Sequence, residues 1–251
     1  MRIVLASLVA ASFSLQPAVA ADVKLLTTGA FKPVVTALVA DYERQSGDKV
    51  TIVNDTAGAL VRRIDGGETF DLVVLTPAAI NDLAKAGKVA GGPTNLARVG
   101  VGVVVKEGAP HPDISSVDAF KRALLAAKTV AYIDPASGGS SGIYLDGLFK
   151  RLGIADAIKP KAVLVNGGLV AEHVVNGEAE IGVHQISEIL AVKGAALVGP
   201  IPGEIQNYTV YAGAIGAAAK QPEAARKLLG VFTSEQAVRV LKDKGMEPPP
   251  G

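Results

Sequence analysis

The chain contains no cysteine and no tryptophan in 251 residues, and aromatic residues make up only 4% of it. The absence of cysteine excludes disulfide bonds, thiol nucleophiles and thiolate metal sites. Its three histidines are His111, His173 and His184, and no two of them have the spacing of a local metal-binding motif. We therefore expect no metal and no cofactor.

Long hydrophobic runs are also missing. No segment has the roughly 18 uninterrupted apolar residues of a membrane-spanning helix. The apolar stretch at residues 3–13 is shorter, follows Arg2 and precedes the small residues Ala18, Val19 and Ala20. This order is typical of a secretory signal peptide. We predict that residues 1–20 are removed by cleavage after Ala20 and that the mature chain is exported.

The chain has no excess of charge of either sign. Arg2 is the only charged residue of the predicted signal peptide, so basic and acidic residues are equal in number in the remainder. A net charge near zero, without a basic run, argues against nucleic acids and anionic membranes as partners. A charged ligand would have to be recognised by a local group of residues.

Strand and helix patterns alternate along the first part of the chain. Apolar strands at residues 23–26, 50–53 and 70–75 are each followed by a helical pattern with one apolar face. Alternation of this kind predicts an α/β fold in which helices cover a mostly parallel sheet.

A second unit of the same kind follows the apolar segment 99–105, which we interpret as a crossing between lobes. Its strands are predicted at residues 129–133, 162–165 and 181–183, and a long strand at 208–215 returns to the first unit. The prediction is therefore two lobes joined by two hinge crossings, with residues 21–100 and 204–251 in the first lobe and 101–203 in the second. The cleft between them is the expected ligand site, and hinge closure is the expected motion.

The segment at residues 134–144 is rich in glycine and serine and connects a predicted strand with a predicted helix. Such a connection places free backbone N–H groups and hydroxyls at the positive end of a helix dipole, which suits an anion. The segment lacks the Gly-Lys-Ser/Thr ending of a nucleotide-binding loop. The alternative is a plain connection in which Ser140 or Ser141 caps the helix.

Four further loops lie where a strand ends and a helix begins, the usual position of ligands in parallel sheets. Lys32, Arg62 and Arg63 lie on helices that begin at such loops and could pair with ligand carboxylates, although side chains of this type more often form a solvated face. The predicted ligand-binding residues of all five loops are Thr28, Gly29, Ala30, Thr56, Ala57, Gly58, Ser140, Ser141, Gly142, Gly167, Gly168, His184 and Gln185.

Local motifs in this order resemble those of the periplasmic molybdate-binding proteins of ABC importers, a branch of the type II solute-binding fold that also includes periplasmic aconitate isomerases. The similarity extends from about residue 23 to about residue 245. The resemblance implies a monomeric periplasmic protein whose partners are a small anion and the membrane subunits of an ABC importer. The motifs are Leu60-Val61-Arg62-Arg63-Ile64-Asp65-Gly66-Gly67, Asp71-Leu72, Asp134-Pro135, Gly142-Ile143-Tyr144, Leu152-Gly153 and Glu180-Ile181-Gly182-Val183.

The same resemblance implies a change of ligand. Family members that bind molybdate hold it with backbone groups, with serines in the first two loops and with a tyrosine after the Gly-Ile-Val strand. Here the matching positions are Gly29, Ala57, Ser141, Gly167 and Gln185. Both serine hydroxyls and the phenol are absent, and glycine in place of serine enlarges the pocket. An organic carboxylate is therefore favoured over molybdate.

Two functions fit this pattern. The first is capture of a small anion for import. The alternative is an isomerase that interconverts cis- and trans-aconitate by proton transfer, which requires a base and hydrogen-bond donors for the enolate-like charge. His184 is the candidate base, with Asp55 or Tyr144 as substitutes. The alternative is that His184 is a partly buried structural histidine with its hydrogen bonds satisfied.

Overall fold

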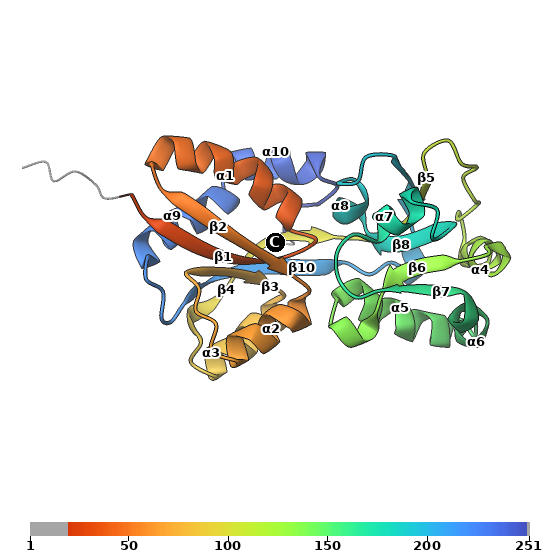
Figure 1. The fold of residues 1–251 in the computed structure, drawn as a ribbon, viewed down its shortest axis with the longest axis horizontal. Coiled ribbons are helices and arrows are strands. Elements are labelled where there is room, and N and C mark those ends of the chain that lie inside the picture. The colour runs from red at the N-terminus through yellow and green to blue at the C-terminus, as the bar shows by residue number, and fades with distance from the viewer. Residues whose placement is uncertain (1–19, 250–251) are drawn as a thin grey trace, which may run out of the picture.

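A computed structural model describes residues 20–249 as two lobes, each built on a five-stranded mixed sheet covered by helices (Figure 1). The predicted two-lobed α/β architecture is thereby confirmed. The predicted signal peptide falls almost entirely outside the described residues. No helix within residues 20–249 is long and apolar enough to cross a membrane.

The sheet of the first lobe has the strand order β2-β1-β3-β10-β4. Strands β1 to β3 are parallel, and β10 runs antiparallel to β3 and β4. The strands are β1 (Asp22–Thr28), β2 (Lys49–Asp55), β3 (Leu72–Leu75), β4 (Val89–Val99) and β10 (Thr209–Gly216). One face is covered by α1 (Lys32–Ser46), α9 (Pro222–Phe232) and α10 (Glu235–Asp243), and the other by α2 (Ala57–Asp65) and α3 (Pro77–Lys85) (Figure 1).

The sheet of the second lobe has the order β7-β6-β8-β5-β9. Its strands are β5 (Val101–Lys106), β6 (Val130–Ile133), β7 (Ala162–Val165), β8 (Ile181–Gln185) and β9 (Ala195–Pro200). One face is covered by α4 (Val117–Ala126), α5 (Ser140–Arg151) and α6 (Ala155–Ile158), and the other by α7 (Val170–Val175) and α8 (Ile186–Ile189). Short 3₁₀ helices lie at η1 (Pro135–Ser137), η2 (Lys159–Lys161) and η3 (Gly203–Ile205).

Local sequence signals account for the ends of several helices. Pro33 lies in the first turn of α1, where its missing N–H costs no hydrogen bond. Gly47 ends the same helix in the left-handed conformation, with φ of 78°. The Thr76 side chain accepts a hydrogen bond from Ala79 N at the start of α3.

Other predicted helix ends are wrong. The glycine pair at 167 and 168, which follows a predicted strand, predicts a helix from Gly168, but the helix begins at Val170 because Gly167 and Gly168 have φ of 123° and 85°, outside the helical region. The sequence also predicts a helix near residues 185–192, but this helix ends at Ile189. The first helical turn of α5 is preceded by Gly139 as N-cap, with no side-chain cap hydrogen bond, so the alternative of a serine cap is also wrong.

Strands β4 and β9 are not predicted by the sequence patterns. Each lies at the edge of its sheet. Edge strands tolerate glycine and proline and leave one side open to solvent, so their apolar alternation is weak. The first half of β4 has this character, since it contains Gly91, Gly92 and Pro93 and is mostly exposed.

The two crossings between the lobes are tied to each other by one side chain. Gln206 follows η3, and its Oε1 accepts a hydrogen bond from Val101 N at 2.8 Å. Its Nε2 donates to Val101 O at 2.9 Å. Gly100 lies beside it, where a Cβ would be 3.2 Å from the Gln206 side chain. The two crossing segments are therefore joined by hydrogen bonds of the Gln206 side chain.

The lobes also touch where α2 of the first lobe meets η1 of the second. Thr56 Oγ1 donates a hydrogen bond to Ser137 O at 2.7 Å, and Gly58 N donates to Gly138 O at 3.1 Å. These direct bonds between lobes indicate a closed arrangement.

A second set of contacts joins the lobes around α8. Ser187 Oγ donates to Ala30 O at 2.8 Å, and Gln185 Nε2 donates to Thr209 Oγ1 at 3.0 Å. All four residues are buried. The second lobe is thus fixed against the β1–α1 loop and the start of β10.

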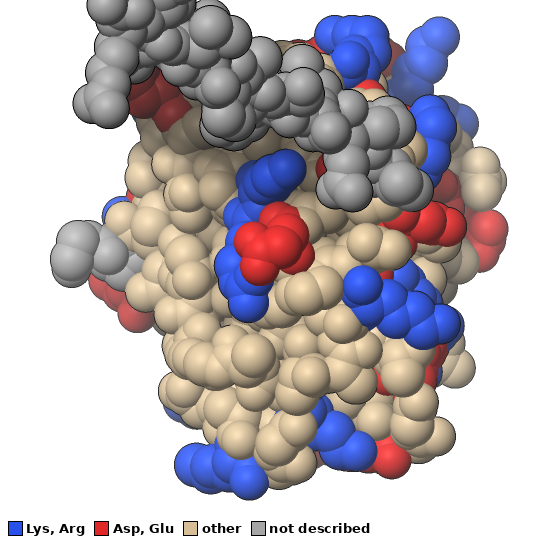
Figure 2. Space-filling model, turned by 90° about the vertical axis from the view of Figure 1, so that its left-hand side faces the viewer, with Lys and Arg blue, Asp and Glu red and all other residues tan. Residues whose placement is uncertain are grey.

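Charged side chains are mixed on the face of the first lobe seen in Figure 2, where basic and acidic groups lie next to one another among uncharged residues. The visible part of this face carries no broad region of one sign.

Candidate functional site

A cavity of about 880 Å³ lies between the two lobes, a size typical of small-molecule sites. The loops after β1 and β2 line it from the first lobe, and those after β6, β7 and β8 from the second. Eleven of the thirteen predicted ligand-binding residues line this interlobe cavity: Thr28, Gly29, Ala30, Thr56, Ala57, Ser140, Ser141, Gly167, Gly168, His184 and Gln185.

The two remaining glycines are held against main chain instead. A Cβ on Gly58 would lie 2.8 Å from Gly138 Cα, and a Cβ on Gly142 would lie 2.3 Å from Ile133 O. Both positions therefore need glycine for close packing. Neither residue lines the cavity.

Of the three candidate bases, Asp55 and His184 line the cavity and Tyr144 does not. The Tyr144 hydroxyl instead donates to Ile205 O. Asp55 Oδ1 accepts a hydrogen bond from Thr56 N at 2.8 Å, which is a local turn contact. His184 is the candidate base with the most enclosed position.

The three cationic side chains predicted near the ligand lie in different places in the structure. Lys32 lines the cavity. Arg62 Nη2 donates to Ser137 O at 3.3 Å and so joins the contact between lobes. Arg63 pairs with Glu68 on the surface of the first lobe. Lys244, which the sequence analysis did not single out, also lines the cavity.

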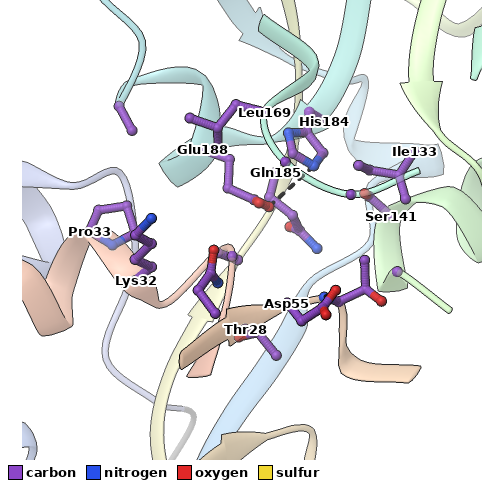
Figure 3. A pocket seen from close by; sticks show the side chains of 18 of the residues that line it. Thr28, Lys32, Pro33, Asp55, Ile133, Ser141, Leu169, His184, Gln185 and Glu188 are labelled. Atoms are coloured by element: carbon purple, nitrogen blue, oxygen red, sulfur yellow. Dashed lines mark hydrogen bonds and ion pairs between the residues drawn. The ribbon is translucent and has the colours of Figure 1, made fainter. Parts of the chain in front are cut away.

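His184 and Glu188 form a buried pair at the cavity wall (Figure 3). His184 Nε2 lies 3.2 Å from Glu188 Oε2, and the two residues are 1% and 7% exposed. They come together because β8 leads directly into α8, so that a spacing of four residues brings both side chains to one side. Glu188 is not among the residues predicted from the sequence.

Burial sets the protonation of this pair. Desolvation disfavours the charged form of each group, lowering the pKa of His184 to about 3 and raising the pKa of Glu188 to about 8. At neutral pH the imidazole is neutral and the carboxyl is mostly protonated. A carboxyl that loses its proton near neutral pH is suited to general acid–base chemistry.

Tyr211 from β10 is another lining residue that the sequence does not reveal. It is 3% exposed. Burial, and secondarily the charge of Glu188, raise the pKa of Tyr211 well above its usual value. The phenol therefore stays protonated and can donate a hydrogen bond.

Three buried polar atoms beside the cavity lack a hydrogen-bond partner within residues 20–249: Thr28 Oγ1, His184 Nδ1 and Gln185 Oε1. Thr28 and His184 reach toward the cavity from opposite lobes (Figure 3). Because buried polar atoms in folded proteins are nearly always hydrogen-bonded, these atoms suit the polar groups of a ligand.

The N-terminus of α5 adds main-chain donors. The bond from Ile143 N to Gly139 O is in the first turn, so the N–H groups of Ser140 and Ser141 precede the regular hydrogen bonds of the helix. Both serines line the cavity, and Ser141 is buried. Free N–H groups at the positive end of a helix dipole favour an anionic ligand.

No group of three or more histidine and acidic side chains within residues 20–249 could hold a metal ion. The described site offers a buried acid–base pair, a phenol, hydroxyls, main-chain N–H groups and two lysines.

Comparison with known proteins identifies the family. The family model of bacterial extracellular solute-binding proteins matches residues 23–247. The chain belongs to this family. Among its relatives is an aconitate isomerase from Pseudomonas sp., 35% identical over 90% of this chain and 87% of that protein. The molybdate-binding protein ModA of Mycobacterium bovis is 25% identical over 76% of this chain and 70% of that protein.

A solved structure supports the same fold. The periplasmic molybdate-binding protein of Azotobacter vinelandii has a TM-score of 0.76 to this solute-binding protein, with 17% identity over 91% of this chain and 100% of the other. The resemblance to molybdate-binding-like proteins, a group that includes aconitate isomerase, is thus confirmed.

The sequence does carry a weak signal for Glu188. In the stretch Ile186-Ser187-Glu188-Ile189-Leu190 it is an acidic residue between apolar ones, four positions after a histidine. Tyr211 carries none, because it lies within an apolar strand that is expected to be buried in any case. Its place at the cavity follows from the crossing of β10 between the lobes.

Proposed function

We propose that this solute-binding protein is an isomerase that moves a proton between two carbon atoms of a small polycarboxylate, and that cis- and trans-aconitate are its substrates. The observation that carries the proposal is the buried pair of His184 and Glu188 at the wall of the interlobe cavity. A carboxyl whose pKa lies near the working pH can take up a proton and return it, a property that proton transfer requires and capture alone does not.

The comparison with relatives supports the same choice. The relative with 35% identity over 90% of the chain is an aconitate isomerase, whereas the molybdate-binding relative has 25% identity over 76%. The cavity also lacks serine hydroxyls at positions 29 and 57, where glycine and alanine stand. A site with fewer short donors is better suited to an organic carboxylate than to a compact oxyanion. The expected enlargement at position 29 is not found, because the Glu188 carboxyl fills the space beside Gly29.

In the proposed reaction, ionised Glu188 removes a proton from the methylene carbon of aconitate. A C–H bond breaks, the carboxyl O–H forms, and the electron pair spreads over the allylic carbons and the adjoining carboxylate. The same proton then returns to the carbon that was vinylic, and the double bond moves to the former methylene carbon. No net proton is gained or lost, and rotation within the intermediate decides the isomer formed.

Other lining residues have roles in this scheme. Neutral His184 holds the Glu188 carboxyl in place through their 3.2 Å contact. The N–H groups of Ser140 and Ser141 and the Tyr211 hydroxyl stabilise the enolate-like charge. Lys32 and Lys244 supply positive charge in the lining for the remaining carboxylates.

The test is to mix the purified protein with trans-aconitate and follow the cis isomer by proton NMR. We expect conversion toward the equilibrium mixture from either isomer. Glu188→Gln should lower turnover by about 10²-fold or more while retaining substrate binding by calorimetry. The matched control is Glu223→Gln on α9, an exposed side chain paired with Arg226, which should leave turnover unchanged. Absence of conversion by the wild-type protein would remove the proposal.

Capture of a small anion for an ABC importer is the second candidate, with export to the periplasm and a monomeric state as its accompanying predictions. It is favoured by the unpartnered Thr28 hydroxyl, which can donate a hydrogen bond to an anion, and by the fold shared with molybdate-binding protein. Calorimetry against molybdate, sulfate and di- and tricarboxylates tests it. Tight binding of one of these anions without any turnover would establish capture in place of isomerisation.

A further inference from the structure

Gly29 and Glu188 occupy neighbouring space although they belong to different lobes. Gly29 follows β1 in the first lobe, and Glu188 lies on α8 of the second. A Cβ built on Gly29 would be 2.2 Å from Glu188 Oε1 and 3.2 Å from its Cδ. Real Cβ atoms do not approach an oxygen so closely, so the carboxyl fills the volume that a side chain at position 29 would need.

The main chain does not require glycine here. Gly29 is not among the glycines with positive φ, and its conformation is open to any residue. Glycine at this position is therefore explained by space alone. The space it leaves is taken by the carboxyl of the proposed base.

The main chains on either side of this contact are held together. Ser187 Oγ donates to Ala30 O at 2.8 Å, and both residues are buried. Each is the chain neighbour of one partner in the contact. The distance between the β1–α1 loop and α8 is thus fixed independently of residues 29 and 188.

A side chain added at position 29 would consequently move the carboxyl and leave the main chain in place. The contact is with the far end of a flexible side chain, and the interlobe cavity lies beside it. Rotation into the cavity would take Glu188 Oε2 away from His184 Nε2, which lies 3.2 Å from it. It would also place the carboxyl in the space of the ligand.

We propose that Gly29 is a positioning residue. Because it has no side chain, the Glu188 carboxyl can occupy the adjoining space when the lobes close and remain in contact with His184. This inference rests on the proposed isomerase function. Its consequence is that position 29 controls turnover from the opposite lobe, without contributing a reacting group.

The experiment compares Gly29→Ala with Glu188→Gln, Gly29→Ala/Glu188→Asp and the control Gly92→Ala. Gly92 lies on the edge strand β4, has no positive φ, and would bring its Cβ within 4 Å of nothing. Turnover of aconitate, its dependence on pH, and thermal unfolding are measured for each variant.

We expect Gly29→Ala to keep the wild-type unfolding midpoint and to lose at least tenfold in kcat. The pH profile should shift as well, because the carboxyl leaves its buried place beside His184. The shorter aspartate in the double variant should restore part of the lost kcat, whereas Gly92→Ala should behave as wild type. A purely structural role for Gly29 would lower the midpoint and allow no rescue.

The outcomes separate the two proposals. If the wild type converts aconitate, Glu188→Gln is inactive and Gly29→Ala is fully active, the positioning role is wrong and the isomerase function stands. If Gly29→Ala is impaired but Glu188→Asp restores nothing, the positioning role is likewise wrong. If the wild type has no turnover, the function fails and the inference fails with it.

Discussion

Gly58 and Gly138 meet main chain to main chain across the two lobes. Gly58 N donates to Gly138 O at 3.1 Å, and a Cβ on Gly58 would lie 2.8 Å from Gly138 Cα. Gly138 has φ of 81°, a conformation that favours glycine. The closed arrangement therefore depends on the absence of a side chain on both partners.

Gly58→Ala is the direct test of this contact. Gly58 lies in the first turn of α2, where alanine is a better helix former by roughly 0.5–1 kcal/mol, so the first lobe should remain folded. The added methyl should hold the lobes apart and weaken ligand binding at least about tenfold. Calorimetry measures the affinity, and small-angle scattering with ligand should show a larger radius than for wild type. Closure of the variant to the wild-type radius would contradict the role of this contact.

The Thr56 hydroxyl makes two hydrogen bonds, and two substitutions can distinguish the loss of these bonds from a change in side-chain volume. Its Oγ1 accepts from Ala59 N at 3.2 Å as the cap of α2 and donates to Ser137 O at 2.7 Å in the other lobe. Thr56→Val removes both hydrogen bonds and should destabilise the protein by about 1 kcal/mol, with weaker ligand binding. Thr56→Ser keeps the hydroxyl and is the matched control. Denaturant unfolding measures the stability of each variant and calorimetry its ligand affinity. Equal effects of Thr56→Val and Thr56→Ser would contradict the contribution of the two hydrogen bonds.

The raised pKa of Glu188 gives stability a defined dependence on pH. Between its usual pKa of 4.5 and its folded value of about 8, the native protein binds one more proton here than the unfolded chain. The contribution of this group therefore falls as pH rises toward 8, by up to about 1.4 kcal/mol per pH unit. Glu188→Gln removes this fall, so the variant should gain stability relative to wild type on going from pH 6.5 to pH 8. Chemical unfolding across this range measures it, and a difference that stays constant would show that Glu188 ionises normally.

His184 acts in the opposite direction and at lower pH. Its pKa falls from 6.5 in the unfolded chain to about 3 in the folded protein, so between these values the unfolded chain binds the extra proton. Its contribution to stability is full above pH 6.5 and is lost as pH falls below that value. His184→Gln should abolish this acid-side loss and leave the alkaline-side fall due to Glu188. Tyr211, the other titratable neighbour, stays neutral throughout this range because burial raises its pKa.

Tyr211→Phe tests the donor from β10. The phenol is 3% exposed and the ring packs in the core of the first lobe, so phenylalanine should preserve the packing. If the hydroxyl stabilises the enolate-like charge, kcat should fall by about tenfold or more with little change in the unfolding midpoint. The control is Tyr208→Phe, an exposed side chain near the second crossing, which should retain wild-type kcat. An unchanged kcat for Tyr211→Phe would assign the hydroxyl a structural role.

The sequence by itself determined the features that depend on neighbouring residues. Alternating apolar patterns gave the order of most helices and strands, and the end of α1 at Gly47 and the start of α3 after Thr76 follow from capping. The carboxyl ends of parallel strands also placed most of the cavity-lining loops, because ligands in such sheets bind at that edge.

Only the tertiary structure decided which further groups complete the site. The edge strands β4 and β9 have weak patterns because pairing on one side alone selects few residue types. Glu188 and Tyr211 reach the cavity through the packing of α8 and β10 against the opposite lobe, and the shifts in their pKa values arise from that burial. Gly29 is a glycine because a carboxyl more than 150 positions away occupies its side-chain space. Contacts between residues so distant in the chain leave no local pattern, since they form only when the two lobes close.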